Sequence, residues 1–367
     1  MKNILFITHD TSRSGAPKSL LLFLNQLYLE GWEFSTISLK GGGELEEEFR
    51  KISKNFFVYE KFKNKPDYTL KSRILRKIIN KKILSEEENF IHSLSKHNFK
   101  LIYGNTIGTI YLAKKINNFI NSEIIIHIHE LKTVIDELCK NESYIKTGIK
   151  KYIVPSFLNM KCLENEYGIN KDKIFLIREC SKINYNNKKH VKSTNKFRVL
   201  MCGGAYWRKG DDIFIQIANL VLKAIKNIEF IWVGHISDER KRVNKADILK
   251  LEIENNVFFI PETQTPEIWY SSSDLFLLCS REDPFPLAAI EAGMSELPIL
   301  CFDKATGISE VIEKEFVIPY LDINEMANKI IELINDPIKR IQTGEKNKKN
   351  FTQFTPDKIK DKIVEIL

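Results

Sequence analysis

The stretch that decides the fold is 197-FRVLMCGGAYWRKGDDIFIQIA-218. Its first six residues form an apolar run that ends at Gly203 and Gly204, and a helical pattern of apolar residues follows over 211–226. A strand that passes through a glycine turn into a helix is the first part of a βαβ unit, and successive βαβ units build a parallel sheet. We therefore expect an α/β sheet around this stretch.

The same alternation of short apolar runs and longer helical patterns extends in both directions. Downstream of the helix over 211–226, we expect strands over 228–234, 256–260, 274–279 and 298–302, and helices over 237–254, 266–272 and 285–294. Upstream, we expect strands over 3–8, 33–38, 100–104 and 123–128, and helices over 17–30, 68–97 and 107–119. The pattern predicts two doubly wound, Rossmann-like domains that face a central cleft.

A segment rich in Lys and Asn, 181-SKINYNNKKHVKSTNK-196, separates the two alternations. We predict an N-terminal domain over 1–180, a linker over 181–196 and a C-terminal domain over 197–349, with a C-terminal helix over 350–367 that rejoins the first domain. A chain of 367 residues is long enough for two domains, each with its own core.

The composition excludes several classes of protein. The chain is 43% hydrophobic and 28% charged, as in a globular protein. Its six cysteines show no CxxC spacing and lie mostly in apolar runs, so we expect reduced thiols rather than disulfides or a zinc site. The first strand starts directly after Asn3, and no run reaches about 18 apolar residues. We expect a cytoplasmic protein with neither a signal peptide nor a membrane span.

The net charge of +8 is concentrated in one segment, 61-KFKNKPDYTLKSRILRKIINKK-82, in which nine Lys or Arg stand against the single Asp67. Leu and Ile recur between these bases at helical spacing, which fits an anionic membrane surface. A solvated helix face explains the pattern equally well. Nucleic acid is not expected as a partner, because no aromatic platform or helix-turn-helix pattern accompanies the bases.

Ligands of open α/β sheets bind beyond the carboxyl ends of the strands. The residues at these points are Gly15, Gly104, Asn105, His129, Glu130, Gly203 to Gly210, Gly234, His235, Glu262 and Asp283. Neither glycine turn matches G-x-G-x-x-G or G-x-x-x-x-G-K-[ST]. The sequence therefore gives little support to a dehydrogenase or a P-loop NTPase.

Arg208 and Lys209 follow one strand of the second half, and a helix is expected to start near Pro284 after another. Fixed cations near the free N–H groups of a helix N-terminus make a diphosphate site that needs no metal. Pro284 and Pro286 lack amide hydrogens, which leaves the amides of Phe285 and Leu287 as donors. Taken singly, an Arg-Lys turn is more often solvated, and acids such as Asp283 and Glu291 are more often helix caps.

The order of segments in the second half resembles a known family. "CGGAYWRKGDDIFIQIA", "IEFIWVGH", "NNVFFIPE" and "SSDLFLLCSREDPFPLAAIEAGMSELPILCF" are similar to the C-terminal domain of the retaining, GT-B-fold glycosyltransferases called glycosyl transferases group 1, or family 4. The resemblance is strong over about 195–315. It is weaker over 1–195, where "HDTSRSGAPKSLLLFL", "LIYGNTI" and "IIIHIHE" resemble the landmarks of the acceptor domain.

The resemblance assigns roles to residues of the C-terminal, donor-binding domain. The paired acids of the family match Asp283, beside the transferred sugar, and Glu291, on the ribose hydroxyls. Lys209 matches the lysine on the donor diphosphate. The family's arginine is missing at Ala205, so Arg208 is its expected replacement. The remaining expected donor contacts are Gly204, Glu262, Phe285 and Leu287.

In the N-terminal domain, His129 matches the family's histidine that faces the donor sugar. His127 points the same way because the side-chain period of a strand is two residues, so it is the alternative. A structural role remains open for either histidine. Gly15 and Ala16 match the family's glycine loop, where a small residue lets backbone amides approach the donor phosphates or the acceptor.

The function implied by the resemblance is transfer, with retention, of a sugar from a nucleotide sugar to a saccharide or lipid-linked acceptor. It places the protein in bacterial polysaccharide or lipopolysaccharide synthesis, at the inner face of the cell membrane. No metal or other cofactor is expected. Two alternatives remain, a nonhydrolysing sugar-nucleotide epimerase of the same fold and an inactive nucleotide-sugar-binding subunit. The departures from the family pattern at Asp283 and Ala205 favour the latter slightly.

Overall fold

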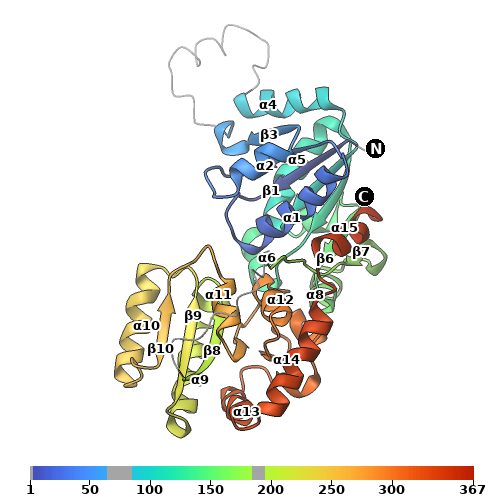
Figure 1. Cartoon of the computed structure of the whole chain (residues 1–367). Helices are drawn as coiled ribbons and strands as arrows, with labels where there is room; N and C mark the ends of the chain where they lie inside the picture. Colours follow the sequence, from blue (N-terminus) through green and yellow to red (C-terminus); the bar gives the residue numbers. More distant parts are fainter. Residues whose placement is uncertain (1–2, 64–84, 184–194) are drawn as a thin grey trace. The chain divides into compact units, whose positions relative to one another are not determined.

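The structure is a computed structural model that describes residues 3–63, 85–183 and 195–367. The chain divides into two compact units (Figure 1). Unit 1 comprises Met1–Val154, Met160–Leu176 and Lys362–Leu367, and unit 2 comprises Pro155–Asn159 and Ile177–Asp361. Each unit has its own parallel sheet flanked by helices, as the alternation in the sequence predicts.

The sheet of unit 1 has the strand order β3-β2-β1-β4-β5-β6-β7, and all its neighbouring strands are parallel. Its strands are β1 (Ile4–Thr8), β2 (Phe34–Ser38), β3 (Asn55–Val58), β4 (Leu101–Asn105), β5 (Glu123–His127), β6 (Lys151–Val154) and β7 (Ile174–Leu176). The helices that accompany them are α1 (Gly15–Leu29), α2 (Glu46–Ile52), α4 (Glu86–Leu94), α5 (Ile110–Ile120), α6 (Lys132–Leu138), α7 (Ser143–Lys146) and α8 (Phe157–Tyr167).

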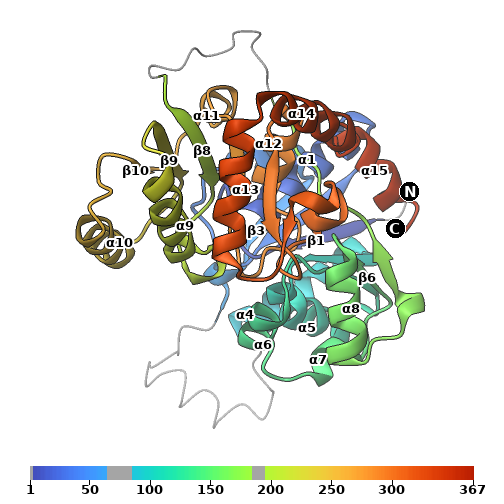
Figure 2. The same ribbon diagram turned by 90° about the horizontal axis from the view of Figure 1, so that it is seen from below.

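The sheet of unit 2 has the order β10-β9-β8-β11-β12-β13 and is also parallel throughout. Its strands are β8 (Phe197–Cys202), β9 (Ile228–Val233), β10 (Val257–Ile260), β11 (Leu275–Leu278), β12 (Ile299–Phe302) and β13 (Val317–Ile318). Its helices are α9 (Asp211–Ala224), α10 (Asp238–Lys250), α11 (Glu267–Ser271), α12 (Leu287–Met294), α13 (Ile323–Asn335) and α14 (Pro337–Phe351). The last helix, α15 (Pro356–Val364), begins in unit 2 and ends in the C-terminal segment of unit 1. Helices α9 and α13 lie side by side on one face of the sheet (Figure 2).

The central strands are buried on both faces, which explains why they appear in the sequence as continuous apolar runs rather than as an alternation. Every residue of β1, β4, β9 and β11 is buried. The rings of Phe6 on β1 and Phe23 on α1 pack edge to face at 6.1 Å. In unit 2, the rings of Phe214 on α9 and Trp232 on β9 do the same at 5.3 Å. Aromatic side chains thus attach the helices to both sheets.

Three expectations about individual elements need correction. The helix expected over 285–294 begins at Leu287, because Pro286 is extended and a residue before proline, here Phe285, disfavours helical geometry. The single helix expected over 350–367 is the end of α14 followed by a separate helix, α15, that starts at Pro356. The sequence pattern also overlooked four short strands, β3, β6, β7 and β13.

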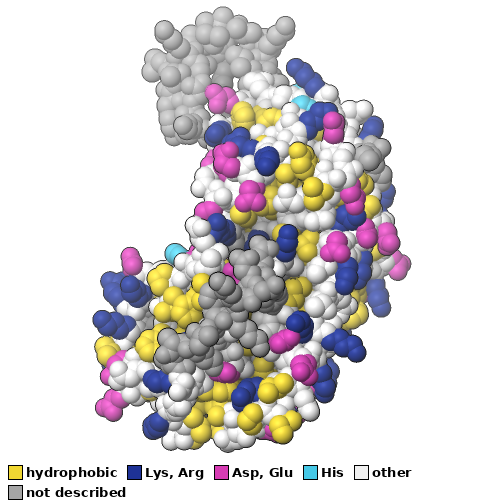
Figure 3. Space-filling view, viewed as in Figure 1, with side chains coloured by type: hydrophobic (Ala, Val, Ile, Leu, Met, Phe, Trp, Pro, Cys, Tyr) yellow, Lys and Arg dark blue, Asp and Glu magenta, His cyan; other side chains and the backbone are white. Residues whose placement is uncertain are grey.

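The cysteines and the charged residues follow the expectations in part. All six cysteines lie in the described residues and form no disulfide, and five of them are buried. Most of the basic segment 61–82 lies outside the described residues, so the structure does not place it. Basic side chains also gather over α10, which contains Arg240, Lys241, Arg242, Lys245 and Lys250 (Figure 3). In the part of the chain that the structure describes, no helix is both long and apolar enough to cross a membrane.

Candidate functional site

The first half of the candidate site is the turn after β8. A short 3-10 helix, Trp207–Lys209, leads through Gly210 into α9. Gly210 has φ +77°, and a Cβ there would lie 2.2 Å from the carbonyl oxygen of Cys279, so only glycine fits. The backbone amide of Arg281 donates to the carbonyl oxygen of Arg208 at 2.8 Å. The turn after β8 is therefore fixed against the segment after β11.

Lys209 and Asp283 meet where these two segments touch. The Nζ atom of Lys209 donates to Oδ2 of Asp283 in an ion pair whose side chains are only 11% and 6% exposed. The hydroxyl of Ser280 donates to the same oxygen at 3.3 Å, and Nη1 of Arg208 lies 3.5 Å from Oδ1. The buried carboxylate of Asp283 thus lies between the cations of Lys209 and Arg208, and the three groups together carry one net positive charge. The sequence placed these residues in one site but did not predict that they pair.

Glu291 lies in the second turn of α12 and is buried. Ser181 donates its hydroxyl to Oε1 at 2.6 Å, and Tyr270 donates to Oε2 at 2.9 Å. Burial raises the pKa of Tyr270 well above its usual value, and the nearby Cys202 and Glu291 raise it further, so this hydroxyl keeps its proton and acts as a donor. Two protein hydroxyls therefore orient the carboxylate. No local pattern in the sequence marks Ser181 or Tyr270 as partners of Glu291.

The other donor contacts expected from the sequence lie in different environments. Phe285 precedes α12, and its buried ring packs edge to face on Phe354 at 5.3 Å, so its side chain belongs to the core. Leu287 is buried at the first position of α12. Gly204 lies under the ring of Tyr206, because a Cβ on Gly204 would be 2.5 Å from Cε1 of that ring. Glu262 is exposed beyond β10, two strands away from β8 in the sheet.

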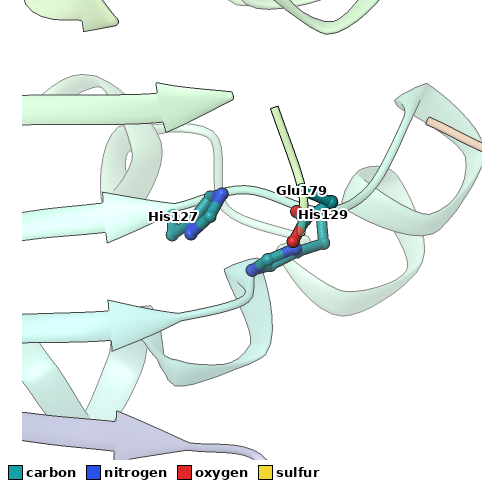
Figure 4. Close-up of side chains that lie close together, drawn as sticks. All are labelled: His127, His129 and Glu179. Atoms are coloured by element: carbon teal, nitrogen blue, oxygen red, sulfur yellow. The ribbon is translucent and has the colours of Figure 1, made fainter. Parts of the chain in front are cut away.

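In unit 1, the candidate residues gather at the carboxyl ends of β4 and β5. The rings of His127 and His129 lie 3.9 Å apart with an interplanar angle of 34° (Figure 4). The two histidines thus lie on the same side, as the strand period predicts. His127 is buried, and its Nδ1 lies 2.8 Å from the hydroxyl of Tyr103. His129 is partly exposed at the strand end.

Asn105 connects His129 to the start of α1. Its Nδ2 donates to the carbonyl oxygen of Ala16 at 2.9 Å, while its Oδ1 lies 2.8 Å from Nε2 of His129. Because the amide nitrogen already faces Ala16, the oxygen is the acceptor and Nε2 of His129 is the donor. Gly15 is exposed as the first residue of α1. The structure therefore brings Ala16 and His129 together through a third residue.

Two neighbouring groups shape this edge of unit 1. Burial lowers the pKa of His9; Asp10 opposes that shift, and His129 adds to it. His9 is consequently neutral at neutral pH. Glu130 accepts hydrogen bonds from the backbone amides of His129 at 2.9 Å and Ile107 at 3.2 Å, which holds the segments after β4 and β5 together.

The comparisons with known proteins find a family that is similar to part of the second half of the chain. The family model described as Glycosyl transferases group 1 matches residues 183–350. An uncharacterized glycosyltransferase of Haemophilus influenzae is 29% identical over 176 residues, which are 47% of this chain and 48% of the relative. The poly(ribitol-phosphate) alpha-N-acetylglucosaminyltransferase of Staphylococcus aureus is 30% identical over 145 residues, 39% of this chain and 29% of the relative. The chain spans less than half of the length of these two curated relatives.

A solved structure matches over the full length. The structure of Anabaena HepE in complex with UDP-glucose superimposes with a TM-score of 0.79 at 17% identity, and the match covers 100% of this chain and 99% of that one. Residues 183–350 are therefore similar to the Glycosyl transferases group 1 family, and the chain has the GT-B fold. The GT-B fold expected from the resemblance is confirmed, and the family model matches the part of the chain that carries the strong resemblance.

Proposed function

We propose that the chain is a retaining glycosyltransferase of family 4. It moves a sugar from a nucleotide-sugar donor to a saccharide or lipid-linked acceptor during the synthesis of bacterial cell-surface polysaccharide. The observation that carries this proposal is the buried ion pair of Lys209 and Asp283, with the partly exposed Arg208 beside it, within the segment that matches the family. The UDP-glucose bound to HepE and the polymer named for the staphylococcal relative support a UDP-sugar donor and a polymeric acceptor.

In this proposal, unit 2 holds the nucleotide part of the donor. Lys209 and Arg208 bind the diphosphate, since the cluster carries an excess of positive charge before the ligand arrives. Glu291 accepts hydrogen bonds from the ribose hydroxyls, and the hydroxyls of Ser181 and Tyr270 orient its carboxylate. Asp283 contacts the transferred sugar, and the role of His129 is the one that the resemblance implies.

The reaction follows from these positions. The oxygen of the acceptor hydroxyl attacks the anomeric carbon on the face that the diphosphate leaves, and the bond between that carbon and the β-phosphate oxygen breaks. The departing phosphate takes the proton of the acceptor hydroxyl. Lys209 stabilises the charge that develops on the leaving group. The fixed cations supply this stabilisation, so the proposal includes no metal ion.

The proposal also keeps the location expected from the sequence, at the inner face of the membrane. The basic segment 61–82 is the predicted contact with anionic lipid. Its residues 64–82 lie outside the described part of the chain, so the contact stays a prediction.

The test is an assay of purified protein with UDP-, GDP- and ADP-sugars, each with and without saccharide and lipid-linked acceptors. We expect release of the nucleoside diphosphate that depends on an acceptor and persists in EDTA. Nuclear magnetic resonance should show the same anomeric configuration in product and donor. Inversion would overturn retention, and loss of activity in EDTA would overturn metal independence.

Two other outcomes would replace the proposal. Conversion of the nucleotide sugar into its epimer without an acceptor indicates the epimerase alternative. Tight binding of a nucleotide sugar without turnover, across the whole acceptor panel, indicates the inactive binding subunit. A shift in melting temperature identifies which nucleotide binds, because a ligand of the native state raises its stability.

A further inference from the structure

The turn after β8 exposes two adjacent aromatic side chains. Tyr206 is 42% exposed and Trp207 is 52% exposed, and they directly precede Arg208 and Lys209. Large rings left in water lose the stabilisation that burial would bring. Single exposed apolar residues are ordinary, but two neighbouring rings at a candidate site indicate a contact surface.

The backbone that carries these rings is rigid. The carbonyl oxygen of Tyr206 accepts hydrogen bonds from the amides of Lys209 at 2.8 Å and Gly210 at 3.2 Å. Nη1 of Arg281 donates to the carbonyl oxygen of Trp207 at 2.7 Å. A ligand that contacts the rings therefore does not have to order the turn first, which lowers the entropic cost of binding.

The two rings differ in what they already contact. Tyr206 is engaged with Arg208, whose Nη2 donates to its hydroxyl at 3.2 Å and whose Cζ lies 5.6 Å from the ring centroid. Tyr206 thus helps to position Arg208. Trp207 has the guanidinium of Arg281 at 5.2 Å from its centroid, and Asp212 holds that guanidinium through two bonds of 2.9 Å and 2.7 Å. Trp207 keeps more than half of its surface available.

We infer that Trp207 is a platform on which a pyranose ring stacks. One face of a pyranose consists largely of C–H groups, which pack on an aromatic ring, while its hydroxyls remain in water at the rim. The inference rests on the proposed function for its position. In that function, Asp283 lies on the sugar side of the diphosphate and Glu291 on the ribose side. Trp207 contacts Arg281, which comes two residues before Asp283 in the chain. A sugar therefore fits this place better than a nucleobase.

The experiment compares the wild type with Trp207→Ala and Trp207→Phe, and with Tyr28→Ala as a control that truncates an exposed aromatic residue of unit 1. Steady-state kinetics measure KM for the acceptor and for the donor separately, and calorimetry measures UDP binding. We expect Trp207→Ala to raise one of the sugar-dependent KM values by about 3- to 10-fold, the scale of one aromatic contact. In Trp207→Phe the affected KM should return most of the way to the wild-type value. The affinity for UDP should stay within about 2-fold of the wild type in both variants.

The KM that changes tells whether the stacked pyranose belongs to the acceptor or to the donor, and either result supports the platform. Equal KM values in the wild type and Trp207→Ala would overturn it. A loss of UDP affinity as large as the change in KM would overturn it too, because the ring would then stack on the base.

A second readout does not need turnover. Trp207 fluorescence is followed while methyl glucoside, methyl galactoside, methyl mannoside and methyl N-acetylglucosaminide are titrated in the presence of UDP. A saturable change that disappears in Trp207→Phe supports the platform, and its absence with all four glycosides counts against it. Failure of the proposed function appears separately, as a lack of nucleotide-sugar turnover in the wild type.

Discussion

The two residues assigned to different parts of the donor, Lys209 and Asp283, form an ion pair in the structure. A buried lysine without a partner would be costly, so the pair explains how the cation stays in place before a ligand arrives. In the proposed function, the diphosphate competes with Asp283 for Lys209. We therefore expect the charge balance of the site, rather than the lysine alone, to set the affinity for the donor.

Replacing Lys209 by Ala should weaken the binding of a nucleoside diphosphate by about 1.5–3 kcal/mol, the scale of a hydrogen bond to a charged group. Binding of the corresponding nucleoside should change little, because it has no phosphate. Calorimetry with both ligands measures the difference. Lys223→Ala, which removes an exposed lysine from the last turn of α9, is the matched control. An equal loss of affinity for the nucleoside and the nucleoside diphosphate would show that Lys209 does not bind the diphosphate.

Replacing Glu291 by Gln should weaken nucleoside and nucleoside diphosphate binding equally, by about 1.5–3 kcal/mol, because the ribose is common to both. The fold should tolerate the change, since the hydroxyl of Ser181 can accept from the new amide while Tyr270 still donates to its oxygen. Calorimetry and urea unfolding measure the two effects. Unchanged nucleoside affinity, or a loss of stability without a loss of affinity, would assign Glu291 to the core.

At the scale of elements, the sequence predicts the long buried strands and the helices between them, because continuous apolar runs mark strands such as β8 and β9 and apolar residues at helical spacing mark the helices. The sequence does not predict strands that are too short to form a recognisable apolar run. β13 is two residues long and is a strand only because β12 pairs with it. Tertiary pairing, which no local window contains, decides such cases.

Gly210 allows a sharper test of one element. Gly210→Ala should destabilise the protein more than Gly31→Ala, although both glycines have positive φ angles, +77° and +79°. An added Cβ meets the Cys279 carbonyl at position 210 but nothing within 4 Å at position 31. Strain from φ alone is worth about 1 kcal/mol, and we expect about 1–3 kcal/mol more at Gly210. Equal urea midpoints for the two variants would contradict this account of the turn.

The contact between Arg281 and Asp212 predicts a dependence of stability on pH. Burial raises the pKa of Asp212, but its bonds to Arg281 outweigh burial and leave the pKa below the ordinary value of 3.8. Because the pKa of Asp212 is lower in the folded state than in the unfolded state, the contact stabilises the folded state at every pH above the unfolded-state pKa. This stabilisation is lost as the pH falls through the folded-state pKa. Urea unfolding between pH 3 and pH 7 should show that the free energy of unfolding falls less steeply with acid in Asp212→Asn than in the wild type. An equally steep fall in both proteins would exclude the contact.

At the scale of the whole molecule, the sequence predicts two α/β sheets and the positions of the motif residues, because each motif follows a strand. It does not predict the partners that orient those residues. Ser181 and Tyr270 converge on Glu291 from segments far apart in the chain, and Asn105 connects Ala16 to His129 in the same way. Such partners can be identified only in the folded chain. The roles proposed for the site residues therefore come from the sequence, whereas the contacts that orient these residues come from the structure.

Membrane association is a prediction for the complete protein. The chain should sediment with vesicles that contain anionic lipid and should dissociate as salt rises, because exposed charges are screened over about 8–10 Å at physiological ionic strength. A variant with Gln in place of Lys71, Lys77, Lys81 and Lys82 should bind more weakly. Binding that ignores lipid charge and salt, or that survives in this variant, would reject 61–82 as the contact.

The central claim is that Lys209 binds the donor diphosphate while Asp283 acts on the transferred sugar. Calorimetry of a nucleoside diphosphate with Lys209→Ala and Asp283→Asn, set beside the turnover of each variant, tests it most directly. We predict that Asp283→Asn lowers turnover but keeps or increases nucleoside diphosphate affinity, because the competitor for Lys209 is gone, whereas Lys209→Ala loses that affinity. An equal loss of nucleoside diphosphate affinity in both variants would contradict the claim and define one joint nucleotide clamp.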